Sequence, residues 1–169
     1  MSTSNVITGT FKGENGREPQ TVIVEAIRNH PFFRGLSSEY VRVLADAAML
    51  TEFAKDQSVF EEGDPANRFY LILEGKVALE SQTEGLDPVQ LQTIGAGEVL
   101  GWSWLFPPYY WHFDARAIEP TRAIFFYGTR LREKAEEDPE FGYELMKRTA
   151  YVVIQRLRMA RQQLLRPGH

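Results

Sequence analysis

The stretch FEEGDPANRFYLILEGKV, residues 60–77, decides the fold class of this chain. Its centre, residues 69–73, is a short apolar run with a turn signal on each side. Gly63 opens the first turn and Gly75 forms the second, and glycine suits tight turns because it adopts a positive φ without a steric penalty. The stretch therefore predicts a strand, a tight turn and the start of a second strand at Lys76.

The apolar run has two faces, because alternate residues of a strand point in opposite directions. Phe69, Leu71 and Leu73 share one face, and Tyr70 and Ile72 share the other. Taken alone, these side chains indicate core positions of an antiparallel barrel and say nothing about a ligand.

The same pattern of short strands and turns continues through the middle of the chain. Alternating apolar residues occur in residues 77–79 and 89–91, and residues 123–127 form the last expected strand. Short strands at a spacing of roughly 8–12 residues are typical of a small antiparallel sandwich or barrel. The turn signals between them are Glu84-Gly85, Asp87-Pro88, Gly95-Ala96-Gly97 and Glu119-Pro120.

The N-terminal part differs in composition. Residues 1–20 are rich in Ser, Thr, Asn, Gly and Glu, and we expect a flexible tail there. Apolar positions from Val22 to Ile27 then precede Pro31, which should end a helix. A second helix is expected to begin near Ser37. Residues 21–138 are therefore predicted to form a helical subdomain plus the barrel.

A long helix is predicted for residues 139–166, and at 1.5 Å per residue it would measure about 40 Å. Apolar residues repeat along it at steps of three and four residues, which is a heptad pattern. So long a helix cannot be covered along its whole length by a small barrel, and we therefore expect a homodimer through this stripe. The alternative is that the stripe lies wholly against its own barrel. The stripe consists of Met146, Ala150, Val153, Leu157, Ala160 and Leu164.

Composition excludes several classes of protein. The 169 residues contain no cysteine and three scattered histidines (His30, His112 and His169), which excludes disulfide scaffolds, thiol catalysis and common zinc motifs. No apolar run is long enough to span a membrane, and no secretory signal begins the chain, so a cytoplasmic location is expected. Residues 145–169 carry six basic and no acidic side chains, but without aromatic or glycine-rich interleaving we expect no nucleic-acid binding.

The order of helices, small barrel and long terminal helix resembles the cyclic nucleotide-binding domain of the catabolite activator and fumarate-nitrate regulator superfamily. The family run G-D-x-A-x-x-x-Y-x-I-x-x-G-x-V matches residues 63–77, and residues 30–37 resemble the opening helix pair. The resemblance covers about residues 24–165. It implies a mainly β fold, an antiparallel β-roll or jelly-roll barrel with N-terminal helices and a long C-terminal helix.

The resemblance also implies a phosphate-binding cassette, in which a glutamate and an arginine hold the ribose and the cyclic phosphate. Gly101 matches the cassette glycine and Leu105 its apolar position, but Trp102 stands in place of the glutamate and Trp111 in place of the arginine. Arg116 lies five residues too late and Glu98 three residues too early. Loss of both charged partners should weaken nucleotide binding by about a hundredfold or more.

Aromatic residues replace the missing charges, since seven aromatic side chains occur between residues 102 and 113. They predict three alternatives: tryptophans that fill the cavity, a pocket for an apolar, aromatic or cationic small molecule, or residual cyclic nucleotide binding. Ser103 and the backbone after Gly101 could still hold an anion. The candidate ligand-binding residues are Gly101, Trp102, Ser103, Trp104, Leu105, Trp111, His112 and Phe113.

These observations favour a stand-alone regulatory domain that binds a small-molecule effector other than a typical cyclic nucleotide. The alternatives are a protein-interaction module with a tryptophan-filled barrel, and weak or atypical binding of cAMP or cGMP. Only three residues follow the long helix, so no helix-turn-helix domain is expected. Catalysis is not expected either, because the barrel segment offers no cluster of metal ligands, and no cofactor is implied.

Overall fold

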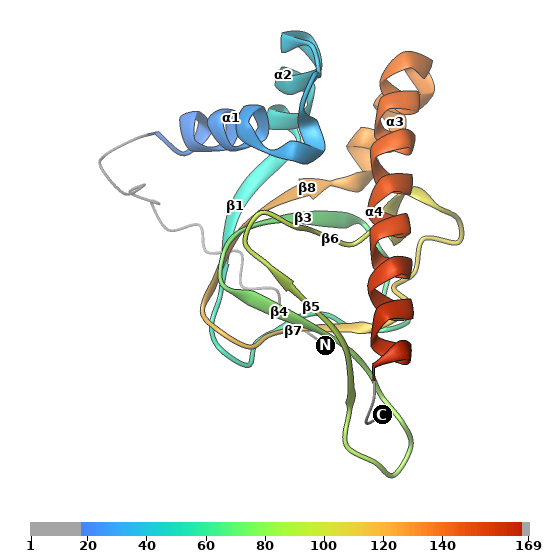
Figure 1. Ribbon diagram of the computed structural model, residues 1–169. Helices are drawn as coiled ribbons and strands as arrows, with labels where there is room; N and C mark the ends of the chain where they lie inside the picture. The colour runs from blue at the N-terminus through green and yellow to red at the C-terminus, as the bar shows by residue number, and fades with distance from the viewer. Residues whose placement is uncertain (1–17, 167–169) are drawn as a thin grey trace.

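Eight strands form two four-stranded antiparallel sheets in the computed structural model, which describes residues 18–166 (Figure 1). One sheet has the strand order β1-β8-β3-β6 and the other β2-β7-β4-β5. This confirms the predicted mainly β class. The strands are β1 (Ala48–Phe53), β2 (Ser58–Phe60), β3 (Arg68–Glu74), β4 (Lys76–Ser81), β5 (Val89–Gly95), β6 (Val99–Leu100), β7 (Asp114–Ala117) and β8 (Thr121–Tyr127).

Helices precede and follow the strands. The tail expected for residues 1–20 lies outside the described residues except at its end, where the first helix already begins at Pro19. The helix was expected from residue 21, so the predicted boundary is two residues too late. It begins at Pro19 because proline is favoured in the first turn of a helix. The helices are α1 (Pro19–Asn29), η2 (Pro31–Phe33), α2 (Ser38–Asp46), η3 (Ser103–Leu105), α3 (Gly128–Glu137) and α4 (Pro139–Leu165).

Local sequence explains where several of these helices begin and end. Helix α1 ends at Asn29 because Pro31 disfavours helical backbone at His30. The Ser37 hydroxyl accepts a hydrogen bond from the Tyr40 N–H at 3.2 Å and caps α2. The Asp138 carboxylate caps α4 in the same way, at 3.2 Å from the Phe141 N–H.

Helix α3 was not anticipated from the sequence. It is rich in charged residues, and only Gly128 and Leu131 in it are buried. A ten-residue helix with one fully buried large side chain has too short an apolar stripe to be recognised by its period. Leu131 nevertheless joins the core beneath the helices, and α3 packs against the first turns of α4.

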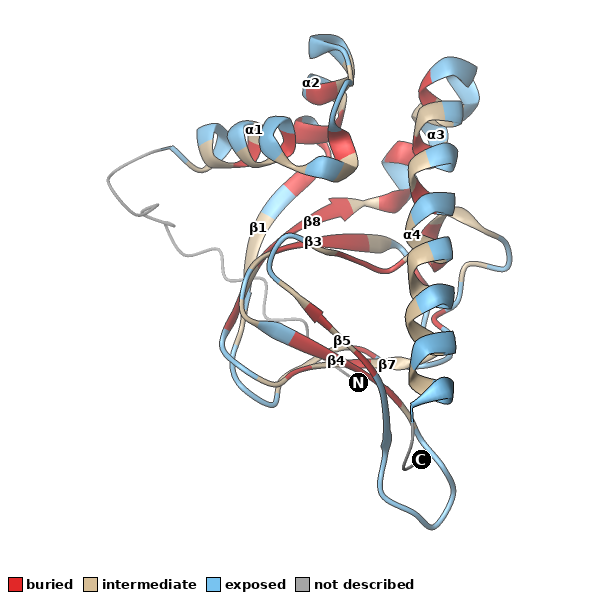
Figure 2. Cartoon of the chain, in the orientation of Figure 1, coloured by how far each residue is buried: buried red, intermediate tan, exposed pale blue. Residues whose placement is uncertain are grey.

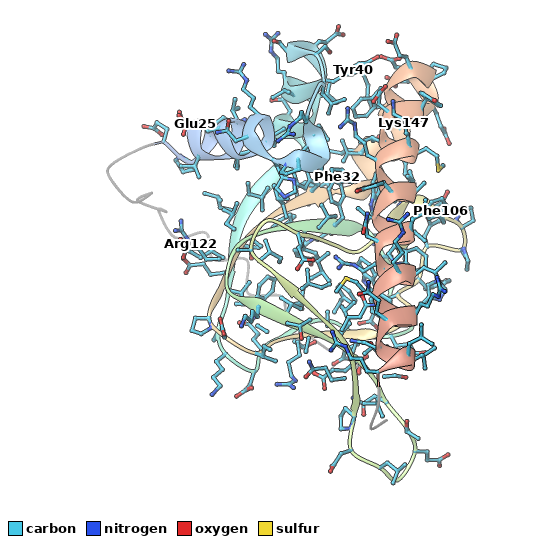
Figure 3. The ribbon with its side chains drawn as sticks, in the orientation of Figure 1. Glu25, Phe32, Tyr40, Phe106, Arg122 and Lys147 are labelled. Carbon is cyan, nitrogen blue, oxygen red and sulfur yellow. The ribbon has the colours of Figure 1, made fainter. Side chains whose placement is uncertain are left out.

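The interior has two hydrophobic cores, separated by the sheet that contains β3. Phe69 and Leu71 point into the core between this sheet and the helices, whereas Tyr70 and Ile72 point into the barrel. The alternation predicted from the sequence is therefore confirmed. Side chains fill the space between the two sheets (Figure 3), and burial is concentrated on the strands and on the helix faces turned toward them (Figure 2).

The turn at Gly75 generates a prediction about stability. Gly75 has a φ of +96°, and an added Cβ would lie 2.5 Å from both the Pro120 carbonyl oxygen and the Thr121 hydroxyl. We expect Gly75→Ala to lower the free energy of unfolding by at least about 2 kcal/mol, measured by urea denaturation. Gly85→Ala is the control, because Gly85 has a φ of +77° with open space around it, and it should cost only about 1 kcal/mol. Equal losses in the two variants would contradict this explanation.

Candidate functional site

The segment that follows β6 begins with a close contact between Gly101 and Trp111. Gly101 has a φ of +93°, and an added Cβ would lie 2.8 Å from the Trp111 ring atom Cη2. Only glycine therefore lets the indole ring rest directly on this backbone. The two residues that the sequence assigned to the cassette glycine and to the missing arginine are thus in contact.

Trp111 is buried inside the barrel. Its ring stacks on Phe60 with the ring centroids 3.8 Å apart and the planes within 8° of parallel. The backbone N–H of Trp111 donates a hydrogen bond to the Asp64 carbonyl at 3.0 Å. The backbone carbonyl of Trp111 accepts one from the Gly63 N–H at 2.9 Å. The Gly63-Asp64 turn recognised in the sequence thereby fixes the position of this tryptophan. A cavity of about 190 Å³ remains beside it, toward Tyr70.

Trp104 lies in a different place, on the helix side of the sheet. It is fully buried in the core beneath the helices and stacks on Phe69 at 4.9 Å. Leu105 packs against the same core. The Arg132 guanidinium of α3 donates to the Trp104 carbonyl, so α3 holds the short helix η3 in place. Trp104 and Leu105 are thus part of the framework beneath the cassette and do not line the groove described below.

Trp102, His112 and Phe113 form the third group of predicted site residues. The rings of Trp102 and His112 stack with their centroids 5.4 Å apart, and His112 is exposed. Trp102 and Phe113 line a groove between the barrel and α4. Ser103, which follows Trp102, is buried, and its hydroxyl has no hydrogen-bond partner among the described residues.

The groove has a volume of about 560 Å³ and is mainly apolar. Strands β4 and β5 form one wall, with Leu79 and residues 89–92, and Trp102 and Phe113 extend it. Helix α4 forms the opposite wall with Val153, Arg156, Leu157, Ala160, Gln163 and Leu164. The sequence did not reveal the contribution of β5 or of Arg156, because residues that lie far apart in the chain meet here only in the folded protein.

Helix α4 buries a stripe other than the one predicted for dimerisation. Phe141, Leu145 and Thr149 are buried against the rest of the chain. Leu157 and Leu164 of the predicted stripe are 70% and 80% exposed. Much of the second half of α4 is accordingly intermediate or exposed in Figure 2. The remaining stripe residues range from intermediate to exposed, and they are Met146, Ala150, Val153 and Ala160.

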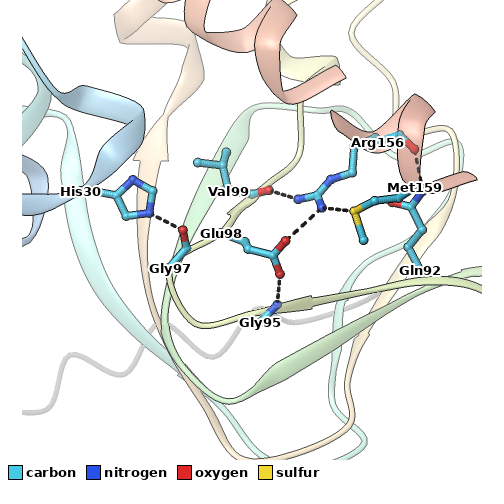
Figure 4. A network of polar contacts seen from close by, with 8 residues as sticks. All are labelled: His30, Gln92, Gly95, Gly97, Glu98, Val99, Arg156 and Met159. Atoms are coloured by element: carbon cyan, nitrogen blue, oxygen red, sulfur yellow. Dashed lines mark hydrogen bonds and ion pairs between the residues drawn. The ribbon is translucent and has the colours of Figure 1, made fainter. Parts of the chain in front are cut away.

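Polar contacts fasten this half of α4 to the turn between β5 and β6 (Figure 4). Arg156 donates to the Val99 carbonyl at 2.6 Å and to Glu98 Oε1 at 3.4 Å. The other Glu98 oxygen accepts from the Gly95 N–H at 2.6 Å. From the opposite side, His30 Nε2 donates to the Gly97 carbonyl at 2.8 Å, and burial lowers the pKa of His30. The turn that leads into Gly101 is therefore tied to α4 and to the end of α1.

Arg116, the arginine that follows the cassette, is already engaged elsewhere. It lies on β7, where it pairs with Glu80 at 2.7 Å and with Asp56 at 3.0 Å, and the contact with Glu80 raises its pKa. It is therefore not free to bind a phosphate. Within residues 18–166 no group of His, Asp or Glu could hold a metal ion, and no helix is long and apolar enough to cross a membrane.

The position of Trp111 predicts a large effect on stability. Trp111→Ala should lower the free energy of unfolding by about 3–5 kcal/mol, because it removes the stacked partner of Phe60 and leaves a cavity in the barrel. Trp102→Ala is the matched control, since Trp102 is only partly buried, and it should cost less than about 2 kcal/mol. Urea denaturation of both variants measures the difference, and a smaller loss for Trp111→Ala than for Trp102→Ala would contradict the placement.

Comparison with solved structures supports this architecture. A cyclic nucleotide-binding protein from Geobacter metallireducens GS-15 is 29% identical, with a TM-score of 0.71 over 83% of this chain and 98% of that chain. The catabolite activator protein of Thermus thermophilus is 25% identical, with a TM-score of 0.62 over 79% of this chain and 61% of that one.

Among curated proteins, the chain is similar to a CRP-like cAMP-activated global transcriptional regulator of Mycobacterium tuberculosis, with 25% identity over 140 residues. That alignment covers 83% of this chain and 61% of the relative, so the chain spans about three fifths of the regulator's length. The family model described as cyclic nucleotide-binding domain matches residues 50–138, more than half of the chain. The chain therefore belongs to the cyclic nucleotide-binding domain family, with CRP-like regulators among its relatives.

Proposed function

We propose that this chain is a regulatory effector-binding domain whose effector is a small molecule other than an ordinary cyclic nucleotide. The main support is the position of the Trp111 ring, which packs against Gly101. The family resemblance places the phosphate-binding arginine at residue 111. An indole ring has no positive charge to pair with a phosphate, and here it also occupies the space next to the glycine backbone. Trp102 removes the second charged partner.

The effector site in this proposal is the groove between Trp102, Phe113 and α4. Its volume of about 560 Å³ suits a small organic molecule, and its walls are largely apolar. One wall belongs to the barrel and the other to α4, so a molecule bound there touches both parts. A ligand that favours one placement of α4 over another shifts the population of the two placements by its differential affinity.

The first test uses the uncharged dye Nile red, whose fluorescence rises in apolar surroundings. We expect it to bind the wild-type protein and to bind Trp102→Ala about tenfold more weakly, because part of the groove wall is lost. Tyr151→Ala is the control, since Tyr151 is an exposed aromatic residue of α4 that does not line the groove. Thermal unfolding should not shift with cAMP or cGMP at millimolar concentration.

The alternatives predict other outcomes. A rise in the unfolding temperature with cAMP or cGMP would contradict the proposal and indicate atypical nucleotide binding without the two charged partners. Absence of Nile red binding to the wild-type protein would also contradict it. That result would favour a protein-interaction module whose barrel is filled by Trp111.

We propose further that the domain is a homodimer through the exposed stripe of α4. The exposed side chains of Leu157 and Leu164, together with Met146 and Ala150 of the same stripe, support this, because a heptad stripe left uncovered is the surface through which helices pair. Val153, Leu157, Ala160 and Leu164 also border the groove. A partner helix on this stripe would therefore lie next to the effector.

The dimer is tested by a charge on the stripe. Ala150→Glu should convert the dimer to a monomer at micromolar concentration, as measured by sedimentation or light scattering, because two carboxylates would face each other across the seam. Gln162→Glu adds the same charge at an exposed position about 120° around the helix from Ala150, and it should leave the mass unchanged. A dimer that persists in Ala150→Glu, or a monomeric wild type, would refute this interface.

A further inference from the structure

Among residues 18–166, Arg156 is the one charged residue that lines the groove between the barrel and α4. The Arg156 side chain is only 14% exposed. A buried guanidinium stays protonated, and burial lowers its pKa, so its charge is costly unless it is well paired. The balance of charge around Arg156 therefore bears directly on which molecule the groove can accept.

The counter-charge that the described residues offer Arg156 is weak. Glu98 is 40% exposed and meets Arg156 Nη1 at the long distance of 3.4 Å. Its other oxygen already accepts a short hydrogen bond from the Gly95 N–H. The shorter contact of Arg156, to the Val99 carbonyl at 2.6 Å, is with a neutral group. A half-exposed carboxylate at this distance offsets little of the cost of burying a cation.

Gln92 adds a polar group to the wall of the groove beside Arg156. Gln92 of β5 lines the groove and is 8% exposed. Its side-chain N–H donates to the Arg156 carbonyl at 2.9 Å, and this contact fixes the orientation of the amide. The opposite atom, Gln92 Oε1, is buried and has no hydrogen-bond partner in the part of the chain that the structure describes. Buried acceptors without a partner are uncommon, so this oxygen marks a polar position in the wall of the groove.

Resting on the function proposed above, we propose that the effector is an amphipathic organic anion, an aromatic or aliphatic ring system that carries a carboxylate or sulfonate. The rings lie between Trp102, Phe113 and Leu157, and the acidic group binds the Arg156 guanidinium in competition with Glu98. Arginine favours this geometry because its planar fork matches a carboxylate. The bound anion thus replaces a contact between α4 and the β5–β6 turn, which links occupancy of the groove to the position of α4.

The test uses 8-anilinonaphthalene-1-sulfonate, an aromatic anion with an N–H donor, beside the uncharged Nile red. Arg156→Gln should weaken binding of the anionic dye about tenfold or more. Glu98→Gln should instead tighten it by about two- to fivefold, because a competitor for Arg156 is removed. A purely structural contact between Arg156 and Glu98 would make both variants change binding in the same direction. Arg158→Gln, which removes a charge from an exposed position of α4, should have no effect.

Two further measurements keep the inference separate from the proposed function. Arg156→Lys retains the charge and should bind the anionic dye more tightly than Arg156→Gln, even if both variants loosen α4. Trp102→Ala should weaken the anionic dye as well, which places its rings in the groove. The inference is overturned if Arg156→Lys and Arg156→Gln bind the anionic dye with equal affinity, or if Glu98→Gln binds it more weakly than the wild type. Binding of Nile red in those cases would still support the groove as the effector site. Failure of both dyes to bind the wild type overturns the proposed function itself.

Discussion

Strand β3 serves both hydrophobic cores, and the rest of the structure depends on that division. Phe69 and Leu71 support the helices, while Tyr70 and Ile72 fill the barrel. Both sets are almost completely buried, and a shift of register by one residue would exchange them. The strand is held in register by β8 on one side and by β6 on the other. Because β6 leads directly into Gly101, the position of the cassette segment follows from this pairing.

Aromatic packing holds the segment that follows β6. Trp111 is fixed by stacking on Phe60, by the backbone hydrogen bonds to residues 63 and 64, and by contact with Gly101. These contacts make it part of the barrel core. The domain therefore keeps the framework of its family, with an indole ring packed against Gly101. A volume of about 560 Å³ is open between Trp102 and α4, compared with about 190 Å³ beside Trp111, and the function proposed above uses the larger one.

The turn between β5 and β6 joins the parts that would have to move together. It receives Arg156 from α4 and His30 from the end of α1, and it continues into the cassette segment. A change in the contacts of Arg156 would thus alter the packing of α4 and the position of β6, the strand that leads into Gly101. Arg156 also faces the groove, so this residue couples a binding surface to the placement of α4 without a long chain of intermediates.

Sequence alone determined the mainly β class with helices on either side, the faces of β3, the start of α2 near Ser37 and the family resemblance, because turn residues, alternation and capping act over a few neighbouring positions. It did not predict strands β1, β2 and β6. It also singled out Trp102 and Trp111, which stand where the family resemblance leads us to expect a glutamate and an arginine. It missed α3, whose single large buried side chain leaves no periodic signal. Only the tertiary structure decided that Trp111 enters the barrel, that Trp104 joins the opposite core, and that Gln92 and Arg156 meet at one groove. Such encounters depend on how strands and helices far apart in the chain pack together, and no local pattern of residues encodes them.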